Sequence, residues 1–119
     1  MKAVICVRTD LKMSTGKIAS QCSHASMDLC HMINSIGCKD WKDVVKKWRR
    51  DGAKIVILKI KSHSQLREME MKARSSSIPS WVVIDMGLTE VESGEESVVM
   101  IGPGEDDVVD DITGTLSTL

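Results

Sequence analysis

Four polar side chains recur at helical spacing within residues 17–28, namely Lys17, Gln21, His24 and Asp28. On a helix that turns about 100° per residue, they fall within an arc of about 60°. We expect this polar stripe to lie opposite the apolar stripe of the same helix. A cation, an amide and an imidazole along one line suit anion binding or hydrolysis, whereas a solvated helix face is the alternative interpretation.

A carboxylate follows directly after the apolar run WVVI at residues 81–84. Asp85 is therefore predicted at the carboxyl end of a strand, where open α/β sheets bind ligands. Partial burial there is expected to raise the pKa of Asp85 and to make it a better general base.

The elements that position these residues follow from hydrophobic periodicity and capping signals. Strands are predicted at residues 3–7, 54–60, 81–84 and 98–101, and helices at 16–36, 40–50, 62–75 and 105–112. This order predicts the α/β class: a single three-layer α/β/α domain over residues 1–119, with a small mixed, mostly parallel four-stranded sheet. The last two strands lie close enough in sequence to pair antiparallel.

The composition is that of a soluble globular protein, with 119 residues, 42% hydrophobic and 28% charged. No apolar run approaches the ~20 residues that cross a bilayer, and Arg8 arrives before any signal-peptide core. We therefore expect a cytoplasmic protein without membrane contact. With three Trp and no Phe or Tyr, a base-stacking platform is disfavoured.

The four cysteines lack CxxC spacing and are predicted to be reduced thiols of an intracellular protein. A zinc site would draw on Cys22, His24, Cys30 and His31, but their spacing matches no structural zinc pattern. No metal is expected.

The charge is distributed unevenly along the chain. Residues 1–74 hold all 16 Lys and Arg and seven acids, a net charge of +9, whereas residues 75–119 hold ten acids and no Lys or Arg. A basic face for a polyanion is one interpretation, and mutual neutralisation of the two parts in a compact fold is the other.

Residues 8–26, RTDLKMSTGKIASQCSHAS, closely resemble the signature of the archaeal and eukaryotic type of peptidyl-tRNA hydrolase, the type 2 family. Three further segments follow in the family's order. Residues 84–89 (IDMGLT) resemble its D-x-G-x-T segment, residues 101–104 (IGPG) a turn expected to shape the site wall, and residues 111–114 (DITG) its closing segment. The similarity spans essentially the whole chain.

This resemblance implies hydrolysis of the ester that joins a peptide to the 3′-terminal ribose of tRNA, without metal or organic cofactor, by a protein that commonly forms homodimers. The family's conserved polar positions match Lys17, Gln21, Ser23, His24, Asp85 and Thr89. A non-catalytic module that binds tRNA or protein on the same fold, or a different esterase, would be the alternatives.

In the expected water-mediated mechanism, Asp85 is the base or water orienter and Lys17 the electrostatic stabiliser. Thr89 and Gln21 orient water or the terminal adenosine, and His24 either shuttles a proton or is structural. A covalent route through Ser23 is the rival, disfavoured because no base for it can be identified.

The basic helix predicted at residues 40–50 is a candidate docking surface for the tRNA backbone through Lys46, Lys47 and Arg50. The alternative is a solvated amphipathic helix that buries Trp41 and Trp48.

The chain departs from the family pattern at residues 14–15, Met86, Leu88 and Glu90. These departures remove positive charge near the site, so fewer phosphate contacts are expected there.

Overall fold

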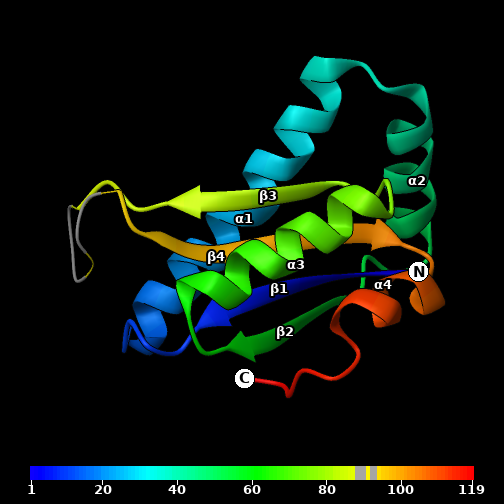
Figure 1. The fold of residues 1–119 in the computed structure, drawn as a ribbon. Coiled ribbons are helices and arrows are strands. Elements are labelled where there is room, and N and C mark those ends of the chain that lie inside the picture. Colours follow the sequence, from blue (N-terminus) through cyan, green and yellow to red (C-terminus); the bar gives the residue numbers. More distant parts are fainter. Residues whose placement is uncertain (88–90, 92–93) are drawn as a thin grey trace.

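The computed structural model describes residues 1–87, 91 and 94–119. Along the chain, the elements are β1 (Lys2–Arg8), α1 (Thr15–Ile36), α2 (Lys39–Arg50), β2 (Ile55–Ile60), α3 (His63–Ser75), β3 (Ser80–Ile84), β4 (Glu96–Gly104) and α4 (Asp106–Thr113) (Figure 1). Each predicted element is confirmed, to within one residue at each end except in β4, which is longer than predicted.

The strands form one sheet in the order β2-β1-β4-β3. β1 pairs parallel with β2 and antiparallel with β4, and β4 pairs antiparallel with β3. The mixed sheet and the antiparallel pairing of the last two strands are therefore confirmed. The described strands β1, β2 and β3 run in the same direction, and β4 runs opposite to them. Because β4 lies between β1 and β3, only the β1–β2 pair is parallel.

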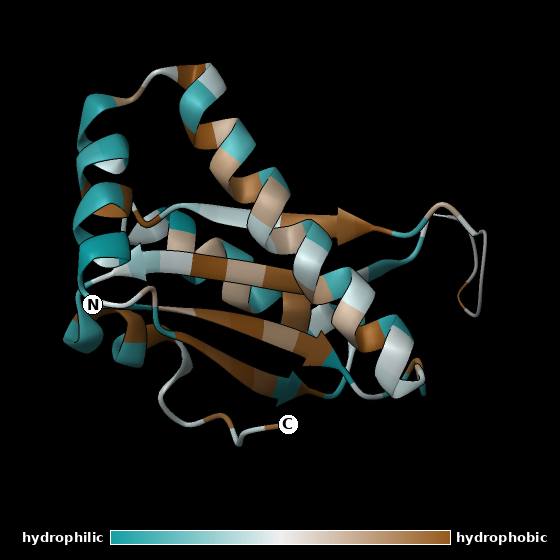
Figure 2. Cartoon of the chain, turned by 180° about the vertical axis from the view of Figure 1, so that it is seen from behind, coloured by the Kyte–Doolittle hydropathy of each residue, from teal (hydrophilic) through white to brown (hydrophobic). Residues whose placement is uncertain are grey.

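Helices cover both faces of this sheet, which confirms the three-layer arrangement (Figures 1 and 2). α1 and α2 pack on one face, where Ile5 and Val7 of β1 are buried. α3 and α4 pack on the other face, where Val4 and Cys6 are buried. Successive residues of β1 thus enter opposite cores, which is why its sequence is continuously apolar.

Local signals fix both ends of α1. The hydroxyl of Ser14 accepts a hydrogen bond from the Lys17 amide at 3.2 Å, and Gly37 ends the helix in the left-handed conformation at φ 74°. The polar stripe lies beside the apolar stripe, about 100° away on the helical wheel, so its expected opposite placement is wrong. Gln21 falls at the boundary and is buried.

The IGPG segment belongs to strand β4, so the expected turn is wrong. Gly104 pairs with Lys2 at the start of β1, far along the sheet from Asp85. Gly102 continues the strand with φ +104°, and a Cβ atom there would lie 3.0 Å from the Cα atom of Ala3. Close approach of β1, together with this positive φ, therefore requires glycine at this position.

The acidic second part of the chain pairs extensively with the basic first part. Ion pairs that join the two parts link Lys2 to Asp110, Arg8 to Glu95, Lys17 to Asp85, Lys47 to Glu105 and Arg67 to Glu96. Much of the uneven charge is thus neutralised within the fold. Separately, none of the helices that the structure describes is both long and apolar enough to span a membrane.

Candidate active site

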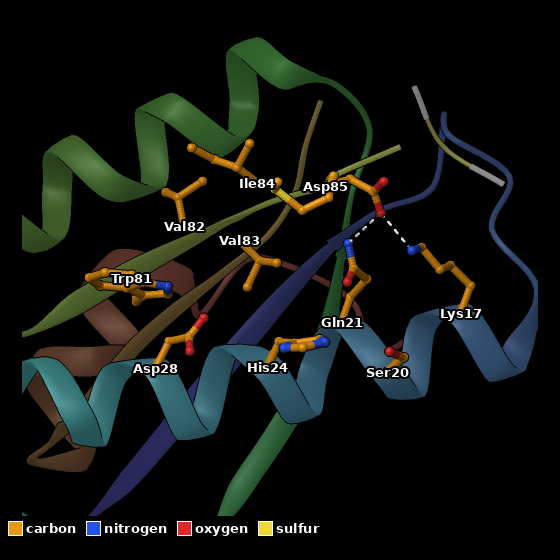
Figure 3. A pocket seen from close by; sticks show the side chains of 11 residues that line it. Lys17, Ser20, Gln21, His24, Asp28, Trp81, Val82, Val83, Ile84 and Asp85 are labelled. Atoms are coloured by element: carbon orange, nitrogen blue, oxygen red, sulfur yellow. Dashed lines mark hydrogen bonds and ion pairs between the residues drawn. The ribbon is translucent and has the colours of Figure 1, made fainter. Parts of the chain in front are cut away.

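An ion pair joins the start of α1 to the end of β3. Asp85 follows β3 directly and is 3% exposed, and the Lys17 side chain, 12% exposed, reaches it from the first turn of α1. Lys17 Nζ lies 2.6 Å from Asp85 Oδ2 (Figure 3). The structure thus brings together the two charged groups that the sequence proposed for ester hydrolysis.

Gln21, one turn further along α1, forms a hydrogen bond with the same carboxylate. Its amide nitrogen donates to Asp85 Oδ2 at 3.1 Å and to Ser97 Oγ at 2.7 Å. Because Gln21 is buried and both of these contacts are made by its Nε2 atom, the orientation of its amide is fixed.

The surroundings of Asp85 lower its pKa, so the expectation of a raised pKa is wrong. The hydrogen bond from Lys17 is the largest influence; burial opposes it, and the Gly87 amide, which donates to Oδ1 at 2.6 Å, adds to it. The hydrogen bonds from the Lys17 ammonium and the Gly87 amide outweigh desolvation because they favour the ionised carboxylate. Asp85 is therefore a fixed anion at neutral pH and a weak proton acceptor.

A cavity of about 520 Å³ opens beside this pair. Its α1 wall is the polar stripe, in which Ser20 joins the four predicted side chains, and its opposite wall is residues 81–86 of β3 and the following segment (Figure 3). Its volume is that of small-molecule clefts, and it runs along β3 to the carboxyl end of the strand.

Three other predicted site residues have different placements. His24 is exposed and lines the cavity, whereas Ser23 is exposed outside the lining and donates its hydroxyl to the Ala19 carbonyl at 2.9 Å. Thr89 lies outside the described residues, as do Leu88 and Glu90 among the departures from the family pattern.

The basic side chains of α2 are not brought to the cavity. Lys46, Lys47 and Arg50 are exposed, and α2 lies beyond the far end of α1 from its Lys17 end (Figure 1). Lys47 also pairs with Glu105 at 3.3 Å. Trp48 is buried and donates to the Lys54 carbonyl at 2.9 Å, as the amphipathic interpretation of this helix expects.

Sequence reasoning missed a charged network that holds the two ends of the site together. Arg8, only 6% exposed, donates to both carboxylate oxygens of Asp10 at 3.1 and 2.6 Å and pairs with Glu95. The Glu95 carbonyl accepts the backbone amide of Asp85 at 2.8 Å. Arg8 thereby ties the segment before α1 to the segment that carries Asp85. Its place in the RTDLKM motif was the available signal.

Ser97 was also missed, because strict strand alternation would turn it away from α1. The β3–β4 register changes from Val83↔Val98 to Ile84↔Glu96, so Ser97 is the extra residue of a bulge. The bulge lets its hydroxyl reach Gln21 on the α1 side. No sequence signal identifies this bulge.

Within the described part of the chain, no three His, Cys, Asp or Glu side chains form a cluster suited to a metal ion. Cys6, Cys22, Cys30 and Cys38 are free thiols. Burial raises the pKa of Cys6 to about 12 and that of Cys22 in the same direction.

The fold and the site together define a class of protein. It is a three-layer α/β domain with a charged cleft beside the edge strand β3. A protein of unknown function from Agrobacterium has a similar fold, with a TM-score of 0.54 at 12% identity over 99% of this chain and 96% of the other. The chain belongs to the peptidyl-tRNA hydrolase PTH2 family, whose sequence model matches residues 1–119. The resemblance noted in the sequence is thus confirmed.

Curated archaeal relatives support the same assignment along the full length. A peptidyl-tRNA hydrolase of Metallosphaera sedula is 40% identical over 119 residues, covering 100% of both chains. Those of Methanopyrus kandleri and Sulfolobus acidocaldarius are 40% and 37% identical, covering 97% and 100% of their own lengths and 99% and 100% of this chain.

The coupling between Lys17 and Asp85 is measurable by a double-mutant cycle with Lys17→Met and Asp85→Asn. We expect a coupling free energy of about 2 kcal/mol at neutral pH, because each charge loses its buried partner in the single variants. The lowered folded-state pKa means that this stabilisation is present above the unfolded value of about 4 and is lost only below it.

Urea denaturation should therefore give the same coupling at about pH 7 and about pH 5. The exposed Lys39–Asp43 pair, 2.9 Å apart on α2, is the matched control and should show much weaker coupling. Loss of the Lys17–Asp85 coupling by pH 5 would contradict the lowered pKa of Asp85.

Proposed function

We propose that this chain hydrolyses the ester bond between a peptide and the 3′-terminal ribose of tRNA, which releases free tRNA. The observation that carries the proposal is the buried Lys17–Asp85 ion pair in the wall of an open cavity, in a chain that belongs to the peptidyl-tRNA hydrolase family. In this reaction water attacks the ester carbonyl, the bond to the ribose oxygen breaks, and that oxygen receives a proton.

Lys17 is the group that stabilises the developing negative charge. Its ammonium has three N–H donors, and the contact with Asp85 uses one of them. The others remain for the oxyanion of the tetrahedral intermediate or for a nearby phosphate. Because the ammonium is held in place before the reaction, little reorganisation accompanies charge development in the transition state.

Asp85 acts as the anchor of Lys17 and as a water orienter. Oδ2 accepts from Lys17 and Gln21, and Oδ1 accepts from the Gly87 amide, which leaves acceptor capacity on Oδ1 for a water molecule. Its lowered pKa makes Asp85 a poor general base. His24, exposed on the same wall, is the candidate that delivers a proton to the leaving ribose oxygen. Thr89 remains a proposed catalytic residue and Ser23 a proposed substrate contact.

Replacing Lys17 by Ala or Asp85 by Asn should lower kcat by about 10²–10³-fold, the usual effect of removing one preorganised electrostatic group. The measurement is release of free tRNA from a model peptidyl-tRNA, with aminoacyl-tRNA as the substrate control. Lys59→Ala, at an exposed lysine of β2, is the matched control and should leave turnover unchanged. Near-normal turnover by both site variants, or tRNA binding without release by the unmodified chain, would refute the proposal.

We also propose that α2 contacts the tRNA backbone away from the cavity. The described part of the chain extends 36 × 30 × 25 Å, and a nucleic-acid duplex presents one negative charge per ~1.7 Å of axis. A duplex that runs back along the domain from a terminus held beside Lys17 would therefore meet the exposed Lys46 and Arg50. Lys47, already paired with Glu105, contributes less.

Joint replacement of Lys46, Lys47 and Arg50 by Gln should raise KM and reduce the dependence of log KM on log salt by about two charge equivalents. The value of kcat should change less than about twofold, because these side chains lie outside the cavity. Steady-state kinetics from about 50 to 200 mM salt measure both effects. An unchanged salt slope would show that α2 is only a solvated helix face.

A homodimer within the cytoplasm, with residues 1–119 as one domain in each copy, remains part of the proposal. Exposed apolar side chains outside the cavity, Met27 on α1 and Met71 on α3, support self-association. The four free thiols support a reducing compartment.

Sedimentation equilibrium should give about twice the 13.1 kDa of one chain. Met27→Lys and Met71→Lys, tested separately, should identify the helix that forms the interface by shifting the mass to that of a monomer. The mass of a monomer for the unmodified chain at micromolar concentration would contradict the dimer.

A further inference from the structure

The two edges of the sheet are treated differently. The chain terminus covers the β2 edge, where Leu58 pairs with Thr118 and the Lys59 amide donates to the Ser117 carbonyl at 2.9 Å. β3 ends the sheet on the other side, and no described segment pairs with its outer edge. Such an edge presents backbone donors and acceptors to any extended chain that lies beside it.

This open edge borders the same cavity as the Lys17–Asp85 pair. Residues 81–86 line the cavity consecutively, although alternate side chains of a strand point to opposite faces. Trp81 and Val83 pack toward α1, whereas Val82 packs on the α3 side. The feature that these consecutive residues share is the outer backbone edge of β3, so this edge forms part of the cavity wall.

The chemistry of the cavity changes along its length. Lys17 and Asp85 lie at one end, and at the other end Asp28 projects from α1 toward Trp81 (Figure 3). Among the described lining residues no Lys or Arg lies beyond Lys17, and no described cation pairs with Asp28. The Asp28 end therefore repels phosphate and favours an uncharged or cationic occupant.

A second cavity, of about 590 Å³, continues along the same edge. Trp81, Val82 and Ile84 line both cavities, and Met32 and Ile36 of α1 add apolar surface to the second. The α3 side of this second cavity carries Glu70 and Arg74, which pair with each other at 2.9 Å. A path of this kind accommodates a longer chain without a defined sequence, because backbone pairing rather than side-chain recognition supplies most of the contacts.

We propose that the peptide half of the substrate lies extended and parallel to β3 in this groove, which rests on the function proposed above. Its ester carbonyl lies at Lys17 and Asp85, and its amino end points toward Trp81 and Asp28. The nucleotide then lies toward the amino end of α1, where Lys12 and Lys17 supply positive charge.

The length of the groove sets the number of peptide residues that it holds. Trp81 and Asp85 are four residues apart, about 13 Å along a strand, and Lys17 and Asp28 are eleven residues apart, about 16 Å along a helix. About four extended residues fill this distance. The α-amino group of a tetrapeptide would then lie near Asp28.

A series of peptidyl-tRNAs with one, two, three, four and six residues, sharing the same carboxyl-terminal residue, tests this proposal. We expect kcat/KM to rise about tenfold from one to four residues, with a smaller further rise at six residues, where the chain reaches the second cavity. At four residues a free α-amino group should give a higher kcat/KM than an acetylated one, and Asp28→Asn should remove that difference. Asp111→Asn, at an exposed acid of α4, is the matched control and should retain it.

Trp81→Ala should abolish the rise with length, so that it lowers kcat/KM more for the four-residue substrate than for the one-residue substrate. Trp81→Phe should keep most of the rise with length. This conservative variant distinguishes loss of the aromatic groove wall from misfolding of the domain. Equal rates at every length, or an equal effect of Trp81→Ala at every length, would overturn the proposal although peptidyl-tRNA hydrolysis itself would stand.

A binding measurement keeps the test independent of turnover. A tetrapeptide joined by an amide to 3′-amino-3′-deoxyadenosine cannot be hydrolysed as an ester and should bind more weakly to Trp81→Ala than to the unmodified chain. If no peptidyl-tRNA is cleaved, the proposed function fails. Binding of this probe then remains the test of whether the groove holds a peptide. A change of oligomeric mass in Trp81→Ala would assign the edge to a second copy of the chain and overturn the proposal.

Discussion

The contact between Lys17 and Asp85 is the constraint on which the site depends. Both side chains are largely removed from water, and either charge alone would carry a desolvation penalty that its partner offsets. The pair fixes the first turn of α1 against the carboxyl end of β3 and leaves the cavity between them open on one side. The interaction that stabilises this junction thus also places a cation beside a space that a substrate can enter.

Arg8 and Gln21 hold the two segments around this ion pair in place and add no further reactive group. Arg8 links the segment before α1 to Glu95, whose carbonyl accepts the Asp85 amide, and Gln21 joins the carboxylate to Ser97 on β4. Each contact connects segments far apart in the sequence, so the site forms only when the sheet is assembled. Preorganisation of this kind is what electrostatic stabilisation of a charged intermediate requires.

The two edges of the sheet differ in whether another segment pairs with them. Residues 117–119 cover β2, a common way to prevent unwanted strand pairing, while no described segment pairs with the β3 edge beside the charged pair. Positive charge at the start of α1 and the acidic, apolar far end of the cavity divide one cleft into two environments. A substrate that is polyanionic on one side of its ester and peptide-like on the other matches that division.

The sequence by itself determined the elements, because they depend on local periodicity and caps: the apolar stripe of α1 ends at Gly37, and the continuous run of β1 predicts burial on both faces. The motif match also singled out Lys17, Gln21 and Asp85, which the structure brings into contact. Only the tertiary structure decided the pKa direction of Asp85, because burial and the Lys17 contact act in opposite senses and their balance depends on distance. The bulge that turns Ser97 toward Gln21, and the entry of β4 between β1 and β3, likewise arise from pairing between segments that no local pattern encodes.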